Sequence, residues 1–155
     1  MSAGPTLRRA TPADVPGIRV CVEAAYRHYI PRMGKPPGPM LDDYEEVVRR
    51  HTVFVVDDGA IQGVLVLIVS ASGMLLDNIA VHPQQQGRGI GAMLMTRAEA
   101  EARRLGHDAL DLYTHECMVE NVAIYRSMGY EETDRREEHG YQRVYMRKRL
   151  GSSPD

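Results

Sequence analysis

A glycine-rich turn in the second half of the chain is the segment best suited to bind an anion. Its sequence, VHPQQQGRGIG, covers residues 81–91 and passes from an expected strand into an expected helix. A helix N-terminus presents unpaired N–H groups, and glycines let the backbone surround a phosphate without interference from Cβ atoms. No Asp or Glu occurs in residues 78–98, so a bound anion would supply the negative charge that a first helical turn favours, assisted by Arg88.

Other interpretations of this turn make different demands on the sequence. A Walker phosphate loop requires Gly-Lys-Ser/Thr after the glycines, and that sequence does not occur here. A dinucleotide-binding unit is disfavoured because the spacing is G-x-G-x-G, the preceding strands look antiparallel, and no acid ends the following strand. A purely structural alternative stays open, in which the glycines only let a helix pack closely against a strand.

Two segments of the chain carry a family resemblance. Residues 78–91 closely resemble the acetyl-CoA signature of the GNAT superfamily of N-acetyltransferases, whose core Gln/Arg-x-x-Gly-x-Gly/Ala is matched by Gln86, Gly89 and Gly91. Residues 120–130, ENVAIYRSMGY, are similar to the second cofactor motif of that family. The two motifs occur in the family's order and separation, which is more specific than either motif alone.

The resemblance implies transfer of an acetyl group from acetyl-CoA, as co-substrate, to a primary amine by direct attack. Backbone amides of residues 86–91 would hold the pyrophosphate, and residues 79–81 would pair with the pantetheine arm as a strand partner. The backbone N–H of Val81 would stabilise the oxyanion that develops on the thioester. The residues expected to bind the cofactor are Ile79, Ala80, Val81, Gln86, Gly87, Arg88, Gly89, Ile90, Gly91, Asn121 and Tyr125.

Asn121 and Tyr125 are four residues apart and therefore share one face of an expected helix. The resemblance implies a hydrogen bond from Asn121 to the cofactor arm and a role for Tyr125 as general acid toward the leaving thiolate. A tyrosine of pKa about 10 stays protonated at neutral pH and can protonate a thiolate of pKa about 8 to 9. The alternative is a surface Asn beside a half-buried Tyr.

A general base is also expected, because the acceptor amine must lose a proton. Four polar residues stand on or just after the two strands that would flank the thioester: Asp77, Asn78, His115 and Glu116. Glu116 or Asp77 is the candidate base, acting through a water molecule, although each can instead be a solvent-facing residue at a strand end.

The resemblance also implies an acceptor pocket. Its expected lining is Tyr26, Tyr29, Met33 and Asn78, and a proline-rich loop that reaches Met40 would cover it. Tyr26 has an alternative place in the core, because it continues the apolar stripe of an expected helix. The identity of the amine, whether a small molecule, an amino acid or a protein amino group, does not follow from these residues.

The pattern along the chain predicts an α/β (α+β) fold with a mixed, mostly antiparallel sheet of about seven strands and about four flanking helices. An Asp-Gly turn between β-branched runs signals a hairpin, and spacings of three or four between apolar residues signal helices. Strands are expected at 7–10, 52–56, 61–69, 74–81, 109–114, 130–133 and 143–147, and helices at 11–29, 42–50, 90–105 and 119–128. Residues 31–39 are expected to be irregular, and residues 134–138 to be a solvated hairpin end.

Length and composition limit the remaining choices. The 155 residues indicate a single domain over 1–150 and a disordered tail over 151–155. A formal net charge of -2 gives no footprint for nucleic acid or an anionic membrane, and two widely separated cysteines read as free thiols of a cytoplasmic protein. No metal site is expected, because the six histidines form no HExxH motif or Cys/His cluster.

Two other functions compete with an acetyltransferase. One is a non-catalytic acyl-CoA-binding module that senses the cofactor, and the other is a nucleotide-binding regulatory domain. The residues do not fix the oligomeric state; a homodimer is one option that the resemblance offers, because family members often pair through their terminal strands.

Overall fold

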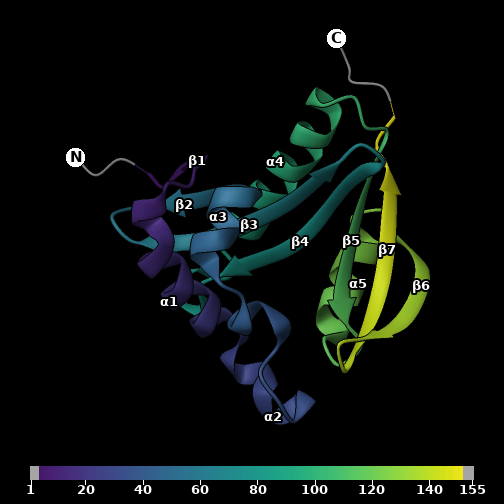
Figure 1. The fold of residues 1–155 in the computed structure, drawn as a ribbon, viewed down its shortest axis with the longest axis horizontal. Coiled ribbons are helices and arrows are strands. Elements are labelled where there is room, and N and C mark those ends of the chain that lie inside the picture. Colours follow the sequence, from purple (N-terminus) through teal and green to yellow (C-terminus); the bar gives the residue numbers. More distant parts are fainter. Residues whose placement is uncertain (1–3, 152–155) are drawn as a thin grey trace.

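The computed structural model describes residues 4–151 and contains a seven-stranded sheet with helices on both faces (Figure 1). The sheet order is β1-β2-β3-β4-β5-β7-β6, and every neighbouring pair is antiparallel except β4 and β5, which are parallel. The strands are β1 (Thr6–Arg9), β2 (Thr52–Asp57), β3 (Ile61–Ser70), β4 (Gly73–Val81), β5 (Ala109–His115), β6 (Glu131–Glu138) and β7 (Tyr141–Arg149). The predicted mixed sheet is confirmed.

Four helices of seven or more residues pack on this sheet. In Figure 1, α1 (Val15–Tyr26) and α3 (Tyr44–Arg50) cover one face, and α4 (Ile90–Arg104) and α5 (Val119–Ser127) cover the other. Each face has its own apolar cluster, one built around α1 with β2 and β3, the other around α4 with β3, β4, β5 and β7. No helix within residues 4–151 is long and apolar enough to cross a membrane.

The segment between α1 and α3 is more ordered than the sequence predicts. The first helix ends at Tyr26, and a 3-10 turn (Arg27–Tyr29), the single-turn helix α2 (Ile30–Met33) and a second 3-10 turn (Gly38–Leu41) follow it. Pro31 does not stop α2, because a first helical turn needs no N–H from its proline. We call residues 34–42 the strap.

The last hairpin also differs from the prediction. β6 runs to Glu138 instead of ending near residue 133, so the predicted end of the strand is wrong, whereas the predicted solvent exposure of residues 134–138 is confirmed for all but the half-exposed Glu138. Its side chains are almost all charged and exposed, which suits a strand at the edge of a sheet because charge opposes pairing with other chains. The tail predicted over 151–155 lies outside the described residues except for Gly151.

The parallel strands β4 and β5 stay together over a short distance only. Their register pairs Leu75 with Asp111 and Leu76 with Leu112, and no pairing follows after Leu76 within residues 4–151. Beyond this point β4 continues to pair with β3 alone. The edge of β4 that faces β5 is therefore open from residue 77 onward.

A bulge begins this open edge. In the β3–β4 ladder Leu67 pairs with Leu76 and Val66 with Asn78, so Asp77 is the extra residue. Before the bulge, Leu76 belongs to the α4 cluster, and after it the buried Asn78 faces the side on which α1 lies. Bulges re-aim side chains next to functional sites, and this one sends Asp77 toward the gap between the strands.

Close packing of α4 on β3 depends on Gly63. A Cβ atom at this position would lie 2.8 Å from Ile90 Cγ2 and 3.1 Å from Leu94 Cδ1, and both side chains are buried. We expect Gly63→Ala to lower the free energy of unfolding by about 1 to 3 kcal/mol, because overpacking forces neighbours to shift. Denaturant unfolding measures this. Gly73→Ala is the matched control, because its Cβ meets no atom within 4 Å; equal losses in both variants would contradict the packing argument.

Candidate active site

The glycine-rich turn connects β4 to α4 through left-handed backbone. Gly87 and Gly89 have φ angles of 83° and 82°, a region that other residues rarely adopt, and Gly89 is the N-cap of α4. The first turn of α4 contains no acidic residue. Gly87 and Gly89 are exposed, whereas Ile90 is buried in the core and anchors the start of the helix. The turn therefore presents free N–H groups and the positive end of the helix dipole to the outside.

A cavity of about 580 Å³ lies against this turn, and we call it the turn cavity. Its walls come from the end of α1, the end of β4, the glycine turn and α5. Ten of the eleven residues predicted to bind the cofactor line it. Arg88 is the exception, since it is exposed and lies outside the lining.

The open edge of β4 forms part of the same wall. His82 N donates to Gln62 O at 2.9 Å, so His82 and Gln62 form a hydrogen-bonded pair of the β3–β4 ladder. Along an antiparallel ladder, hydrogen-bonded pairs alternate with pairs whose backbone groups point away from the partner strand. By that alternation Asn78 and Ala80 direct their backbone groups toward β3, whereas Ile79 and Val81 direct theirs away from it. The N–H of Val81 therefore faces the open edge, as a strand partner or an oxyanion would require.

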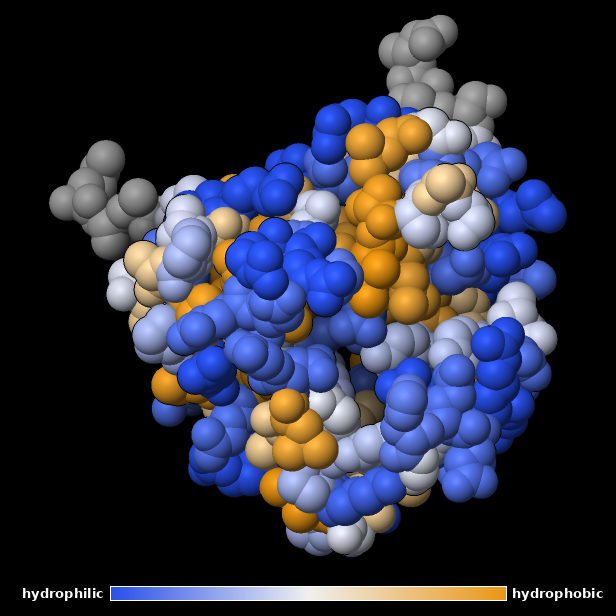
Figure 2. Space-filling model, viewed as in Figure 1, coloured by the Kyte–Doolittle hydropathy of each residue, from blue (hydrophilic) through white to orange (hydrophobic). Residues whose placement is uncertain are grey.

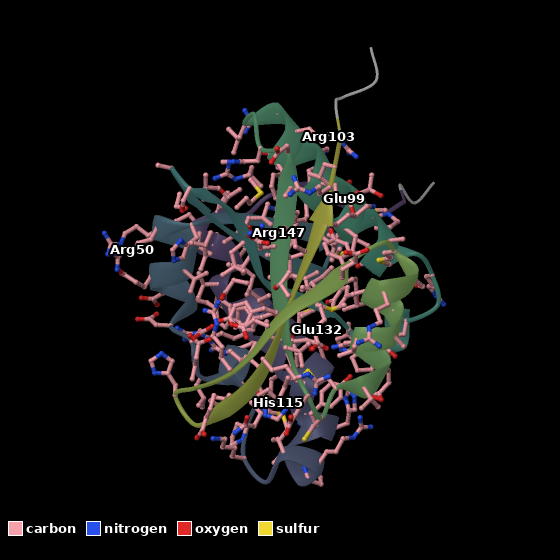
Figure 3. All side chains as sticks on the ribbon, turned by 90° about the vertical axis from the view of Figure 1, so that its right-hand side faces the viewer. Arg50, Glu99, Arg103, His115, Glu132 and Arg147 are labelled. Atoms are coloured by element: carbon pink, nitrogen blue, oxygen red, sulfur yellow. The ribbon has the colours of Figure 1, made fainter. Side chains whose placement is uncertain are left out.

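A second cavity of about 240 Å³ fills the gap between the diverging strands, and we call it the gap cavity. β4, β5, β7, the strap and α5 line it. Figure 2 shows the surface hollowed near the middle of this face, with hydrophilic residues on both sides. Figure 3, which looks onto β6 and β7, places His115 at the end of the strands near α2. The two cavities meet at shared lining residues: Tyr26, Ile79, Asn121 and Tyr125.

Tyr125 stands at this junction on α5. The residue is 8% exposed, its ring lies edge-on to Tyr130 at 6.1 Å, and within residues 4–151 its hydroxyl has no hydrogen-bond partner. Burial raises the pKa of Tyr125 above its ordinary value, and Tyr29 raises it further. The hydroxyl is therefore protonated at neutral pH and free to donate. Asn121 lies one helical turn earlier and lines both cavities.

The four residues expected around the acceptor occupy different positions. Tyr26 and Asn78 line the gap cavity, but both are also held in a buried hydrogen-bond network. The Tyr26 hydroxyl lies 2.7 Å from Asn78 Oδ1 and 2.8 Å from Ile79 O, so these two acceptors share its single proton. Asn78 Nδ2 donates to the Tyr44 hydroxyl at 3.0 Å. Met33 lines the gap cavity, whereas Tyr29 lines the turn cavity only.

The two candidate bases are separated by the structure. Asp77 lines the gap cavity, and its Oδ1 accepts a hydrogen bond from the Tyr113 hydroxyl at 2.7 Å. Glu116 is exposed and lines neither cavity, because β5 ends at His115 and the chain turns away. His115 does line the gap cavity; burial lowers the pKa of its imidazole, Lys35 lowers it further, and Glu116 partly opposes both.

Several lining residues of the gap cavity were missed by the sequence reasoning. They come from the strap and from β5 and β7, and include Asp42, Tyr113, Tyr141 and Arg143. Side chains alternate along a strand, so Tyr113 on β5 and Tyr141 and Arg143 on β7 share one face of the sheet. No local pattern in the sequence identifies that face as the wall of a cavity. The strap is held across the cavity by Tyr141, whose hydroxyl donates to Pro36 O at 2.6 Å, and by Lys35, which donates to Gly140 O.

The fold agrees with what is found by comparison with known proteins. The family model described as an acetyltransferase (GNAT) domain matches residues 49–132, more than half of the chain. The chain therefore belongs to the GNAT acetyltransferase family.

Relatives and solved structures support the same assignment. The chain is 27% identical over 99 residues to the uncharacterized N-acetyltransferase YvbK of Bacillus subtilis, a match that spans 63% of each chain. The ribosomal-protein-S18-alanine N-acetyltransferase of Escherichia coli has the same fold, with a TM-score of 0.75, 18% identity and 97% of both chains covered. PaiA N-acetyltransferase of Thermoplasma acidophilum, in complex with coenzyme A, gives a TM-score of 0.76 at 15% identity, covering 95% of this chain and 99% of that one. At these identities the structures establish the fold.

Proposed function

We propose that this protein transfers the acetyl group of acetyl-CoA to a primary amine by direct attack. The observation that carries the proposal is the junction of two cavities at Tyr125, next to the open edge of β4. One cavity has an anion-binding turn and the other has carboxylates, so each suits one of the two reactants. The bound coenzymes of PaiA and of the YncA structure from Salmonella typhimurium, solved with acetyl-CoA, support the choice of donor.

The residues of the turn cavity fit acetyl-CoA. No atom lies within 4 Å of the Cβ position of Gly87 or Gly89, so the backbone there is open to a phosphate group. The open edge of β4 offers backbone groups to the amides of an extended arm. When bound, acetyl-CoA would supply an activated acetyl thioester.

Side chains at the junction and in the gap cavity account for the proton transfers of the reaction. The amine nitrogen forms a C–N bond to the acetyl carbon, and the C–S bond breaks. Asp77 takes the proton of the amine, directly or through a water, and the Tyr125 hydroxyl gives its proton to the sulfur, which leaves as the CoA thiol. The N–H of Val81 stabilises the oxygen that becomes negative. Transfer of the proton from Asp77 back to Tyr125 through solvent completes the cycle.

Asp77 is a better base than Glu116 for reasons of position. The bulge sends Asp77 into the gap cavity, where its Oδ1 accepts a hydrogen bond from Tyr113, which leaves Oδ2 for a water or an amine. Glu116 would have to act across the end of β5 from an exposed position. We therefore assign the base to Asp77.

Two measurements on the full chain test this function. Acetyl-CoA is expected to raise the melting temperature, whereas ATP and NAD are not, and release of free CoA is expected with at least one class in a panel of amines, amino acids and peptides. Protection by acetyl-CoA without release of CoA from any amine would favour the acyl-CoA-binding module. Protection by ATP or NAD alone would favour the nucleotide-binding domain.

A further inference from the structure

The gap cavity contains two carboxylates from separate elements. Asp77 is the bulge residue of β4, and Asp42 ends the strap just before α3. Much of Asp42 is exposed, but its side chain lines the cavity, and burial followed by the nearby Asp77 raises the pKa of its carboxyl. Both carboxylates line the same cavity of about 240 Å³, and they repel each other when both are ionised.

Neither carboxylate is paired with a cation. Within residues 4–151 no Lys, Arg or His nitrogen lies within 4.0 Å of either group, and Asp77 has only the neutral hydroxyl of Tyr113. Among the described residues that line the cavity, Arg143 is the one Arg or Lys side chain. Its guanidinium stacks 4.3 Å from the Tyr113 ring centre and lies 3.5 Å from Glu138. Arg143 also lowers the pKa of Asp42, but less than burial and Asp77 raise it, so it compensates the two carboxylates only in part.

Asp42 and Asp77 lie in the cavity where, under the proposed function, the amine would react. Tyr125 is 8% exposed and lines the same cavity, and its hydroxyl has no hydrogen-bond partner in the described part of the chain. Under the proposed function Asp77 accepts the proton of the attacking amine, which must be neutral when it attacks. The attacking amine therefore cannot also offset the charge of Asp42. An acceptor with a second, permanently protonated group would do so, and Met33, Leu76 and Met118 would contact the carbon chain between the two nitrogens.

We propose that the acceptor is a short amine with a second cationic group, with Asp42 binding the cation and Asp77 facing the amine that reacts. This inference rests on the proposed acetyltransferase function and specifies its substrate class. The volume of the cavity, about 240 Å³, suits a compact acceptor, and the strap over it limits bulk beyond the second charge. Asp42 acts here as a specificity-determining residue, and it takes no part in the proton transfers.

Three amines of equal chain length test the proposal. They are 1,4-diaminobutane, butylamine and 4-aminobutanoate, compared by kcat/KM for CoA release with saturating acetyl-CoA. We expect the diamine to exceed butylamine about two- to fivefold, because an ion pair with a largely exposed carboxylate contributes modestly, and 4-aminobutanoate to be the poorest. Butylamine equal to the diamine, or 4-aminobutanoate as the best acceptor through Arg143, would overturn the proposal.

Two variants assign the preference to Asp42. Asp42→Asn is expected to reduce the ratio of diamine to butylamine to about one, mainly through the KM for the diamine. Glu45→Gln removes the same charge from an exposed position on α3 outside both cavities, and should keep the ratio of the parent protein. An unchanged ratio in Asp42→Asn would show that Asp42 does not bind the second cation. Absence of CoA release from all acceptors is a different result, which removes the proposed function itself.

Discussion

Replacing Tyr125 with phenylalanine is expected to lower kcat about 10²-fold and to leave the Kd for acetyl-CoA nearly unchanged. The factor stands at the lower end of what general acid catalysis contributes, because a thiolate of pKa about 8.5 leaves more readily than a stronger base. The hydroxyl opens to both cavities, so its loss removes the proton donor. The ring stays packed against Tyr130 and keeps the local structure. Single-turnover release of CoA and equilibrium binding separate the two quantities.

Tyr130→Phe is the matched control for this variant. Tyr130 is a buried neighbour whose hydroxyl donates to Glu99 Oε2 at 3.0 Å, and it lines neither cavity. Its loss should affect the free energy of unfolding but not kcat. If Tyr125→Phe had the kcat of the parent protein, Tyr125 would not be the acid. If its Kd for acetyl-CoA rose as steeply as kcat fell, the hydroxyl would bind the cofactor instead of protonating the thiolate.

Gly89→Val is expected to weaken binding of acetyl-CoA about tenfold or more. The residue has a φ of 82°, where a β-branched side chain costs about 1 to 3 kcal/mol and the turn relaxes to another conformation. That change would turn the N–H groups of the glycine turn away from the phosphate site. Isothermal titration with acetyl-CoA, together with denaturant unfolding, distinguishes a loss of affinity from a loss of folded protein.

A second glycine provides the control for backbone strain. Gly59, in the turn between β2 and β3, has a φ of 107° and, like Gly89, no atom within 4 Å of its Cβ position. Gly59→Val should therefore lower the free energy of unfolding by a similar amount and retain the affinity for acetyl-CoA. Equal loss of affinity in both variants would trace the effect to global stability and not to the glycine turn.

The strands and helices followed from local patterns wherever one face of an element is buried. The alternation in β4 and the spacing of apolar residues in α1 predict these elements within a few residues. The prediction failed at β6, because a strand with exposed charges on nearly every residue has no apolar period to detect. It failed again at α2, where the four prolines and two glycines of residues 31–39 concealed a single helical turn.

The candidate site also contains residues that the sequence predicts and residues that only the fold brings together. The residues predicted around the glycine turn are contiguous in the chain, and all but Arg88 line one cavity. The residues of the gap cavity come from the strap, β4, β5, β7 and α5, and only folding brings them together. The choice between Asp77 and Glu116 belongs to this second group, since it depends on a bulge and on the end of a strand.

By itself the sequence determined the type of fold, its family and the turn that suits a phosphate, because each depends on short stretches whose residue types have direct conformational consequences. The tertiary structure decided the position and lining of the gap cavity, where we propose that the amine binds. The opening between β4 and β5 depends on parallel pairing that stops after two residue pairs, and on a strap tied to the far hairpin by Tyr141 and Lys35. Contacts between residues about a hundred positions apart leave no local pattern in the chain, so the gap cavity appears only once the sheet is assembled.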